Sequence, residues 1–503
     1  MANRLALYFT SDTHGYLYPT DFISPGTLEQ GLFRMRFPKD GNTLILDGGD
    51  TLQGSPLTYY CHSKGVSMPC AAAMNDLQYD YITLGNHDFN YGYETLSAYL
   101  CQSNAQCLCA NVEDKAHQLP ILPYTVHTLE NGLRIGLIGI VTHWINVWEQ
   151  PANLTQIHVS DTLQAARNAV DALQGQYDIL IGLYHGGFER DLDTGKRVSE
   201  TDENIGWQLC EELPFTILLT GHQHLPVANH VIHGTHVAQT PCNAKAFIHL
   251  TMDQEGVITS RLCTPDAPVA LRPWEQTLYD NLNQWLDTPI GRLSKPLLPE
   301  LKLDMALHGS PIADFINLVQ LSASDAQISC TALGNERSGF QERVTVRDVV
   351  SSYPYSNTLV VLQVTGSVLR AALEQCATYF NVAQNGAVSI GDAFIKPKEA
   401  HYNYDYFYGI TYTFDLRNPV GERVTSLAYQ GKALLPDATL RLVMNNYRAT
   451  GAGGFACYLP CPRMQEVQTE VSELILDYLS RHEQVLIPDD TPYRTILPDG
   501  STT

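Results

Sequence analysis

The stretch Leu5-Ala-Leu-Tyr-Phe-Thr-Ser-Asp-Thr-His-Gly15 decides the fold, because it joins an apolar run directly to a cluster of polar side chains. The apolar run predicts a buried strand, and Gly15 lets the backbone bend immediately after it. Asp12 and His14, two residues apart on this turn, can both face one cation. The same pair also occurs at helix caps and surface turns, so it indicates a metal site only if other segments support it.

Further apolar runs along the first half of the chain end in the same way. Buried strands are predicted at residues 5–9, 43–46, 81–84, 133–141, 179–183 and 215–219. Helical patterns lie between them, the clearest at residues 161–173, where Ser160 or Asp161 can cap the first turn. Strands that alternate with helices predict an α/β domain.

Four later strand ends also carry polar side chains. Asp50 follows two glycines, Asn86 and His87 are neighbours, and histidines follow the last two apolar runs. An open α/β sheet places its sites where strands end, so five consecutive ends with Asp, Asn or His favour one shared metal site. The predicted ligands are Asp12, His14, Asp50, Asn86, His185, His222 and His224. Oxygen and nitrogen donors without thiolate suit Mn, Fe, Co or Zn better than Ca.

The length of 503 residues predicts two large domains. The strand pattern ends near residue 270, where a helix with apolar Leu278, Leu282 and Leu286 leads into a proline-rich stretch. We expect a first domain over 1–270, a linker helix and hinge over 271–300, and a second domain over 301–503. The second domain is expected to be α+β, with helices at 311–321, 367–380 and 467–481 and strands at 358–364 and 410–414.

The composition is that of a water-soluble protein, with 44% hydrophobic and 17% charged residues. No apolar run is long enough to span a membrane, and the amino terminus lacks the cleavage site of a secretory signal, so a cytoplasmic location is expected. A net charge of −22 disfavours binding to nucleic acid or to an anionic membrane. The 12 cysteines are scattered and are expected to be free thiols.

The strand-end motifs resemble, in order, the signature of the calcineurin-like metallophosphoesterases. The motifs are Asp12-Thr-His14, Gly49-Asp50, Gly85-Asn-His-Asp88, His185 and Gly221-His-Gln-His224. The two-part layout of the whole chain is similar to the family branch with a C-terminal substrate domain, the 5′-nucleotidases and cyclic-nucleotide phosphodiesterases. The resemblance implies a four-layer α/β/β/α metallophosphoesterase domain followed by an α+β domain that binds the nucleotide.

The resemblance also implies a role for each motif residue. The ligands would be Asp12, His14 and His224 for a first divalent ion, Asn86, His185 and His222 for a second, and Asp50 as the bridge. Two ions about 3.5–4 Å apart clamp a phosphoryl group and lower the pKa of a bridging water. The implied mechanism is in-line attack of a metal-bridging hydroxide on phosphorus, while His87 assists departure of the leaving oxygen.

Asn90 departs from the pattern of many 5′-nucleotidases, in which an aspartate at that place orients the catalytic histidine. An amide cannot raise the basicity of His87 as a carboxylate does, so His87 is expected to be less basic. Asparagine there looks more like the 2′,3′-cyclic-nucleotide 2′-phosphodiesterase/3′-nucleotidase branch. The tyrosine-rich segment 402–415 and the segment 444–455, which begins Met-Asn-Asn-Tyr-Arg, are similar to that branch as well.

A nucleobase is expected to lie between aromatic side chains of the second domain. The candidates are Tyr447 and either Tyr404 or Tyr402, although the tyrosines that alternate over 402–408 can equally form the core face of a strand. Arg337 lies near the place of the family's substrate arginine, with an ordinary surface role as the alternative.

These features predict an enzyme, a metal-dependent phosphoric ester hydrolase that acts on 2′,3′-cyclic nucleotides and 3′-nucleotides. The alternatives are a 5′-nucleotidase or nucleotide-sugar hydrolase of the same fold, a nucleotide-binding protein without turnover, and a nuclease. The expected partner is a small nucleotide, and monomer and homodimer both stay open. Because the ions and the base would sit on different domains, rotation near residues 285–305 is expected to bring them together.

Overall fold

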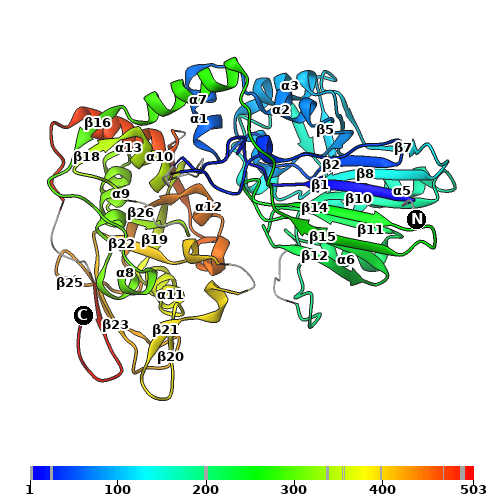
Figure 1. Cartoon of the computed structure of the whole chain (residues 1–503). Helices are drawn as coiled ribbons and strands as arrows, with labels where there is room; N and C mark the ends of the chain where they lie inside the picture. Colours follow the sequence, from blue (N-terminus) through cyan, green and yellow to red (C-terminus); the bar gives the residue numbers. More distant parts are fainter. Residues whose placement is uncertain are drawn as a thin grey trace. The chain divides into compact units, whose positions relative to one another are not determined.

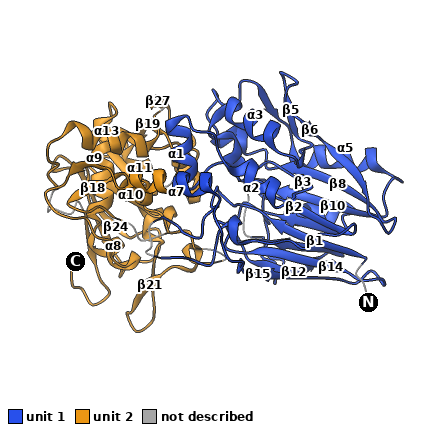
Figure 2. Cartoon of the chain, turned by 45° about the horizontal axis from the view of Figure 1, so that its top comes forward, with its two compact units in different colours: residues 1–278 blue, residues 279–503 orange. Residues whose placement is uncertain are grey.

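The structure of the chain is a computed structural model that describes residues 4–22, 26–197, 202–335, 339–353, 355, 357–396, 399–467, 469–487 and 493–503. It divides into two compact units, residues Met1–Leu278 and Tyr279–Thr503 (Figure 2). Helix α7 (Pro273–Leu286) contains the boundary between them. Each unit has its own sheets and its own core.

The first unit contains two large sheets (Figure 1). The seven-stranded sheet has the order β15 (Ile258–Cys263), β14 (Phe247–Met252), β1 (Leu5–Thr10), β2 (Thr43–Asp47), β3 (Tyr81–Ile82), β4 (Gln106–Leu108) and β6 (Ile121–Leu122). The six-stranded sheet has the order β12 (Val227–Ile232), β13 (Thr235–Gln239), β11 (Ile217–Thr220), β10 (Ile179–His185), β8 (Arg134–Val141) and β7 (Tyr124–Thr128). Strands β1 to β4 of the first sheet pair in parallel, and so do β8, β10 and β11 of the second, so their carboxyl ends meet at one edge of each sheet.

A hydrophobic core fills the space between the two sheets. Leu5, Leu7 and Phe9 of β1 are fully buried in it, together with alternate residues of β8, β10 and β11. The alternation of side chains puts Tyr8 on the opposite face of β1, where its ring stacks on His249. The apolar side chains of the first strand are thus buried against the six-stranded sheet.

Helices cover the outer faces of the two sheets. Because the inner face of the seven-stranded sheet is filled, its crossover helices α1 (Pro56–Lys64), α2 (Cys70–Asp76) and α3 (Gly92–Gln102) lie on the outer side. Helices α5 (Thr162–Leu173) and α6 (Gly206–Glu212) pack on the outer face of the six-stranded sheet. Asp161 caps α5, since its carboxylate accepts the Gln164 backbone N–H. The predicted four-layer α/β/β/α domain is confirmed.

The second unit contains a five-stranded and a four-stranded sheet. The five-stranded sheet has the order β22 (Asp405–Tyr408), β17 (Ile328–Ala332), β26 (Thr439–Asn445), β19 (Leu359–Thr365) and β27 (Arg463–Val467). The four-stranded sheet has the order β25 (Lys432–Ala433), β24 (Val424–Tyr429), β23 (Thr411–Asp415) and β28 (Tyr493–Ile496). Helices α9 (Pro311–Ser322), α11 (Gly366–Ala377) and α13 (Val471–Arg481) share one core with them, which confirms the predicted α+β class.

Smaller elements connect these layers. The two-stranded pairs are β5 (Val112–Asp114) with β9 (Ile157–Val159), β16 (Pro289–Arg292) with β18 (Arg343–Thr345), and β20 (Phe380–Val382) with β21 (Val388–Ile390). The short helices are α4 (Ile145–Trp148), α8 (Lys302–His308), α10 (Val346–Ser352) and α12 (Asn446–Ala449). Most of these strands and helices are too short for their apolar residues to show a strand or helix periodicity in the sequence.

The predicted boundaries of helices and strands differ from the structure by up to four residues, as three elements illustrate. The helix predicted over 467–481 begins only at Val471, because residues 463–467 pair with β19 as strand β27. The helix predicted over 367–380 ends at Ala377, and Phe380 begins strand β20. Strand β3 ends at Ile82 rather than Leu84. In each case pairing with a distant strand decides where the element begins or ends.

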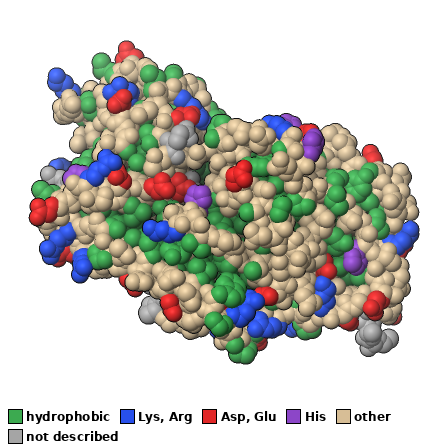
Figure 3. Space-filling view, turned by 90° about the horizontal axis from the view of Figure 1, so that it is seen from above, with side chains coloured by type: hydrophobic (Ala, Val, Ile, Leu, Met, Phe, Trp, Pro, Cys, Tyr) green, Lys and Arg blue, Asp and Glu red, His purple; other side chains and the backbone are tan. Residues whose placement is uncertain are grey.

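Two further expectations concern the chain as a whole. Within the described part of the chain, no helix combines the length and the apolar character needed to cross a bilayer. All 12 cysteines are free thiols, as expected. On the face shown in Figure 3, acidic and basic side chains are scattered rather than gathered by sign.

Candidate metal centre

Strand ends from both sheets of the first unit bring the predicted ligands together. Asp12 and His14 follow β1, Asp50 follows β2, Asn86 begins the 3-10 helix η2 (Asn86–Phe89), His185 ends β10, and His222 and His224 follow β11. The turns between these segments are tightly packed. A Cβ atom added at Gly85 would overlap the Asp50 carboxylate, and one at Gly221 would overlap the Ser11 hydroxyl. Glycine is therefore required where the neighbouring turns touch.

Five of the seven ligand residues have a left-handed backbone. The φ angles are 55° at Asp12, 49° at His14, 58° at Asp50, 68° at His222 and 58° at His224. For a residue with a Cβ atom, this conformation costs about 1–2 kcal/mol. Such backbone persists where the surrounding structure holds it in place, and it is concentrated at functional sites. The backbone is therefore strained at the residues whose side chains converge.

Asp12, His14 and His224 form one group of potential ligands. The Nε2 atom of His224 lies 3.2 Å from Oδ1 of Asp12 and 3.3 Å from Nε2 of His14. The other ring nitrogen of His14, Nδ1, lies 2.7 Å from the Gln53 carbonyl oxygen and donates to it. This hydrogen bond fixes the tautomer, so Nε2 of His14 presents a lone pair to the centre.

Asp12, Asp50 and His185 form a second, overlapping group. The Nε2 atom of His185 lies 3.2 Å from Oδ2 of Asp50 and 3.3 Å from Oδ1 of Asn86. Its Nδ1 atom donates to the Gly48 carbonyl oxygen at 2.7 Å, which again leaves Nε2 with a lone pair. Nδ1 of His222 lies 2.9 Å from the same Asn86 oxygen. All seven predicted ligands are thus linked by short separations between their donor atoms.

These separations fit bound divalent ions. Two ligand atoms bonded to one ion at about 2.1 Å lie about 3.0–3.4 Å apart when the bonds meet at 90° to 109°. Asp12, Asp50 and His185 are at most 1% exposed, and carboxylates at that depth need a cation or several donors. The donor set contains carboxylate, amide and imidazole groups that suit two divalent transition-metal ions.

Two carboxylates that the sequence analysis did not single out as site residues hold the ligands in place. Asp88 accepts backbone N–H groups of Asp50, Thr51, Leu52 and Gly85 at 2.8–3.0 Å, which ties the Asp50 turn to the Asn86 turn. Glu203 Oε1 lies 2.9 Å from Nε2 of His222, so Nδ1 is the ring atom of His222 that faces Asn86 and the other ligands. Asp88 follows the Asn86-His87 motif directly, whereas no local pattern marks Glu203.

His87 lies beside the metal ligands rather than among them. Its ring centroid is 5.4 Å from that of His14, and its backbone N–H donates to Oδ1 of Asp50 at 2.7 Å. Its Nδ1 atom lies 2.7 Å from Oδ1 of Asn90. Asn90 in turn donates from Nδ2 to Glu149 Oε2 at 2.6 Å, which adds a carboxylate that the sequence analysis missed. Both predicted catalytic residues therefore lie at the edge of the centre.

Charges within the centre determine the protonation of its histidines. Burial lowers the pKa of His14 to about 4, so this imidazole is neutral at pH 7. Burial also disfavours charge on His185, but Asp50 outweighs it and raises the pKa of His185 to about 9. For His224, burial is outweighed by the Cys242 sulfur and by Asp12, which raise the pKa to about 10. In the absence of an ion, protons on His185 and His224 therefore offset the negative charge of Asp12, Asp50 and the Cys242 sulfur.

The predicted substrate residues of the second unit have different environments. Tyr447, in α12, and Tyr402, in the 3-10 helix η4 (His401–Asn403), are both half-buried. Tyr404 is only 2% exposed, its hydroxyl donates to the Ala306 carbonyl at 3.2 Å, and its ring packs on Tyr379 and Tyr406. The burial of this ring favours the alternative given for Tyr404, a place on the core face of a strand. Arg337 lies outside the described residues.

Arg448 connects the segments that carry Tyr402 and Tyr447. Its side chain is 2% exposed, its Nη2 atom donates to the Tyr402 carbonyl oxygen at 2.7 Å, and its Nε atom lies 2.9 Å from Oδ2 of Asp405. The guanidinium also donates to the Ala452 carbonyl oxygen and lies over the Phe455 ring at 4.2 Å. A buried arginine with this many partners fixes several loops at once.

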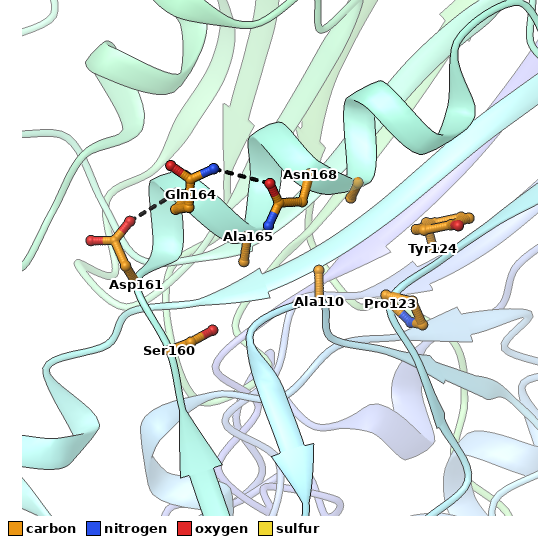
Figure 4. A pocket seen from close by; sticks show the side chains of 9 residues that line it. Ala110, Pro123, Tyr124, Ser160, Asp161, Gln164, Ala165 and Asn168 are labelled. Carbon is orange, nitrogen blue, oxygen red and sulfur yellow. Dashed lines mark hydrogen bonds between the residues drawn. The ribbon is translucent and has the colours of Figure 1, made fainter.

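A separate pocket of about 310 Å³ lies where the start of α5 faces Pro123 and Tyr124 (Figure 4). None of the predicted site residues lines it. Its polar side chains bond mainly to their own helix, since Asp161 caps α5 and Gln164 donates to Asn168 at 3.0 Å. We assign no ligand to this pocket.

Comparison with known proteins matches two families to two parts of the chain. Residues 5–226 match the calcineurin-like phosphoesterases, and residues 289–459 match the 5′-nucleotidase C-terminal domain. A trifunctional nucleotide phosphoesterase of Bacillus subtilis is 25% identical over 96% of this chain, which spans 38% of that protein. A 2′,3′-cyclic-nucleotide 2′-phosphodiesterase/3′-nucleotidase of Haemophilus influenzae is 24% identical over 89% of this chain and 80% of its own length.

Among solved structures, a candidate 5′-nucleotidase from Staphylococcus aureus is similar to nearly the whole chain. It superposes with a TM-score of 0.87 and is 32% identical, covering 98% of this chain and 99% of its own. A 5′-nucleotidase precursor from Thermus thermophilus is 23% identical with a TM-score of 0.66, which shows a shared fold.

Metal binding is expected to release protons at pH 7. His185 and His224 have pKa values raised to about 9 and about 10 without an ion, and each must lose its proton before its Nε2 atom binds one. Titration of the metal-free protein with Mn²⁺ should release close to two protons, and the affinity should rise with pH. Calorimetry in two buffers with different heats of ionisation measures this number. Binding without proton release would contradict the charge balance described here.

Replacement of Arg448 by Met should destabilise the second unit by about 3–5 kcal/mol, because it leaves the Asp405 carboxylate buried without its partner. Urea unfolding of the full chain, followed by circular dichroism, measures the loss. Arg463→Ala is the matched control, since the Arg463–Glu466 pair is half-exposed and should contribute less than about 1 kcal/mol. Equal losses in the two variants would show that the Arg448–Asp405 pair is not a structural support.

Proposed function

The chain belongs to the calcineurin-like phosphoesterases that carry a 5′-nucleotidase C-terminal domain, and on this premise we propose that it hydrolyses phosphate esters of nucleotides. We further propose that 2′,3′-cyclic nucleotides and 3′-nucleotides are its preferred substrates. The half-buried Tyr447 and Tyr402 of the second unit are proposed to hold the nucleobase, and of the two candidates Tyr402 and Tyr404 we favour Tyr402 because Tyr404 is buried.

The observation that carries the proposal is the convergence of the seven potential ligands. Asp12, His14 and His224 are proposed to hold one ion, with Asp50 shared between the two. Asn86, His185 and His222 are proposed to hold the second. When bound, such ions polarise phosphoryl oxygens and make a water nucleophilic near neutral pH. Mn, Zn, Fe and Co all suit these donors.

The residues around the ions are proposed to orient the reacting groups. The carbonyl oxygens of Gln53 and Gly48 keep His14 and His185 in the tautomer that faces the centre. His87 donates from Nδ1 to Asn90, so its Nε2 atom is left to give a proton to the leaving oxygen. The hydrogen bond from the His87 backbone to Asp50 keeps this donor beside the metal ligands. The protein thus separates ligand histidines from a proton-donating histidine.

The choice of substrate rests on Asn90 and on similarity to relatives. Asn90 stands where many 5′-nucleotidases carry an aspartate, and relatives over 89% or more of the chain include cyclic-nucleotide phosphodiesterases with 3′-nucleotidase activity in their names. Activity on 5′-nucleotides is the second candidate, favoured by the likeness to the Staphylococcus aureus structure. Both candidates need the same metal centre and differ in how the ribose is placed.

Asp50→Asn should lower kcat by about 100- to 1000-fold, because the amide removes the shared negative charge between the two proposed ions. Initial rates with 3′-AMP and saturating Mn²⁺ measure the effect. Asp114→Asn is the matched control, since the Asp114 carboxylate accepts the backbone N–H groups of residues 116, 118 and 119 in another part of the first unit. A variant at position 50 as active as the parent would exclude the proposed use of the centre.

A substrate panel distinguishes the two candidate activities. With Mn²⁺ we expect kcat/KM for 2′,3′-cyclic AMP and 3′-AMP to exceed that for 5′-AMP and for a UDP-sugar by at least about tenfold, a difference of roughly 1.4 kcal/mol in transition-state binding. Release of inorganic phosphate gives each value, with a coupled phosphatase added for the cyclic nucleotide and for the UDP-sugar because their hydrolysis products are phosphate monoesters. The reverse order would assign the protein to the 5′-nucleotidases, and hydrolysis of none of the four would reject the proposal.

A further inference from the structure

A chain of hydrogen bonds leads from His87 through Asn90 to a carboxylate that no motif includes. Nδ1 of His87 lies 2.7 Å from Oδ1 of Asn90, and Nδ2 of Asn90 lies 2.6 Å from Oε2 of Glu149. Glu149 is the residue that follows helix α4, and it is separated from Asn90 by 59 positions in the sequence. The contact is therefore made by the fold and not by a local turn.

The chemistry of the three groups fixes the direction of these hydrogen bonds. An ionised carboxylate only accepts, so Asn90 must point its NH₂ group toward Glu149 and its carbonyl oxygen toward His87. The carbonyl oxygen also only accepts, so Nδ1 of His87 must carry a proton. The Nε2 atom, on the other side of the ring, is the one left for the substrate.

Glu149 is held by neutral donors only, as far as the described residues show. Its other hydrogen bonds come from Nδ2 of Asn153 at 2.9 Å and from the Gln150 backbone N–H at 2.7 Å. The Nδ2 atom of Asn153 also donates to the backbone carbonyl oxygen of Asn90 at 3.1 Å, which connects the segment of Glu149 to that of Asn90. Burial raises the pKa of Glu149, and its hydrogen bonds and the nearby His87 oppose that rise. Its Oε2 atom thus faces the Asn90–His87 pair, while Oε1 accepts the other two hydrogen bonds.

We propose that Glu149 is a positioning residue whose charge, transmitted through the Asn90 amide, holds His87 as the proton donor to the leaving ribose oxygen. The inference rests on the proposed function. As the oxygen of water bonds to phosphorus, the P–O bond to the ribose breaks and its electron pair stays on the ribose oxygen. That oxygen takes the Nε2 proton of His87, and the proton lost by water passes to solvent, from which His87 is protonated again.

This arrangement places a carboxylate one group further from the histidine than a direct aspartate would be. Hydrogen bonds in a chain polarise one another, and the Asn90 amide is fixed at both ends. A carboxylate acting through an amide should contribute less than one in direct contact, where replacement by an amide can cost about 10⁴-fold in kcat. We therefore expect a smaller dependence on Glu149, of about 10- to 100-fold.

The first test compares leaving groups in Glu149→Gln. With 3′-AMP, whose leaving alkoxide needs a proton, kcat should fall by about 10- to 100-fold with little change in KM. With p-nitrophenyl phosphate, whose leaving group is stable as an anion, kcat should change by less than about threefold. Equal losses on both substrates would overturn the proposal and assign Glu149 a structural role. A parent enzyme without activity on 3′-AMP would instead contradict the proposed function.

A second variant tests the same idea by rescue. In Asn90→Asp/Glu149→Gln, a carboxylate accepts directly from His87 and the new amide at position 149 donates to it, so most of the 3′-AMP rate should return. In Asn90→Asp alone, two carboxylates would face each other across the present 2.6 Å contact, so no gain is expected. A double variant no faster than Glu149→Gln would contradict the relay. The matched control is Glu189→Gln, a 5% exposed glutamate that accepts the Trp207 and Gln208 backbone N–H groups at the start of α6.

A spectroscopic readout keeps the test independent of activity. In the metal-free protein, the Nδ1–H proton resonance of His87 is identified by its loss in His87→Gln. This resonance should move upfield in Glu149→Gln, because the acceptor oxygen of Asn90 becomes less negative, and should stay in place in Glu189→Gln. An unchanged resonance in Glu149→Gln would show that the charge does not reach His87, whatever the substrate of the enzyme.

Discussion

The constraint on which the first unit depends is the concentration of buried carboxylate charge where its strands end. Asp12 and Asp50 are at most 1% exposed, and each would be costly to bury without a balancing positive charge. Protons on His185 and His224 balance this charge when no ion is bound, and two ions would do so when the protons leave. Left-handed backbone at five ligands adds to the cost. Only a rigid support can hold such a centre, and the two packed sheets with their common core provide it.

The same constraint explains why so much of the site could be predicted from short motifs. Parallel strands must end at one edge, so an aspartate, asparagine or histidine directly after an apolar run marks a side chain near the other strand ends. The strand ends at Thr10, Asp47 and Thr220 lie within a few residues of where the apolar pattern stops. The spacing of apolar residues in predicted strands and helices likewise predicts the layers of the first unit and the α+β class of the second. Boundaries set by pairing with distant strands, such as the start of α13 at Val471, could not be predicted in this way.

Residues that act through tertiary contacts leave no local trace. Glu203 reaches His222 across 19 positions and Glu149 reaches Asn90 across 59, and neither lies in an apolar or glycine-marked pattern. Tyr404 does lie in a recognisable motif, but alternating tyrosines are found both in substrate sites and in the core faces of strands. The packing of its ring on Tyr379 and Tyr406 favours the core role. Arg448, directly after Tyr447, is fully enclosed although arginine is usually exposed. A functional residue can be predicted from sequence when the residues next to it in the chain form a recognisable motif. Glu203 and Glu149 lie in no such motif, because distant residues determine their roles.

The partner of the second ring nitrogen decides what each histidine of the centre can do. His14 and His185 donate from Nδ1 to backbone carbonyl oxygens, neutral acceptors that set the tautomer without adding charge, so each Nε2 lone pair faces the potential ions. His222 is turned the other way, with Nε2 on the Glu203 carboxylate and Nδ1 toward Asn86. His87 is next to a ligand in sequence, yet its Nδ1 atom donates to an amide that is backed by a carboxylate, which leaves Nε2 for the proposed role toward the substrate. Four identical side chains within one centre thus acquire different chemistry from acceptors that lie outside it, and this is why a list of ligands alone does not describe the reaction.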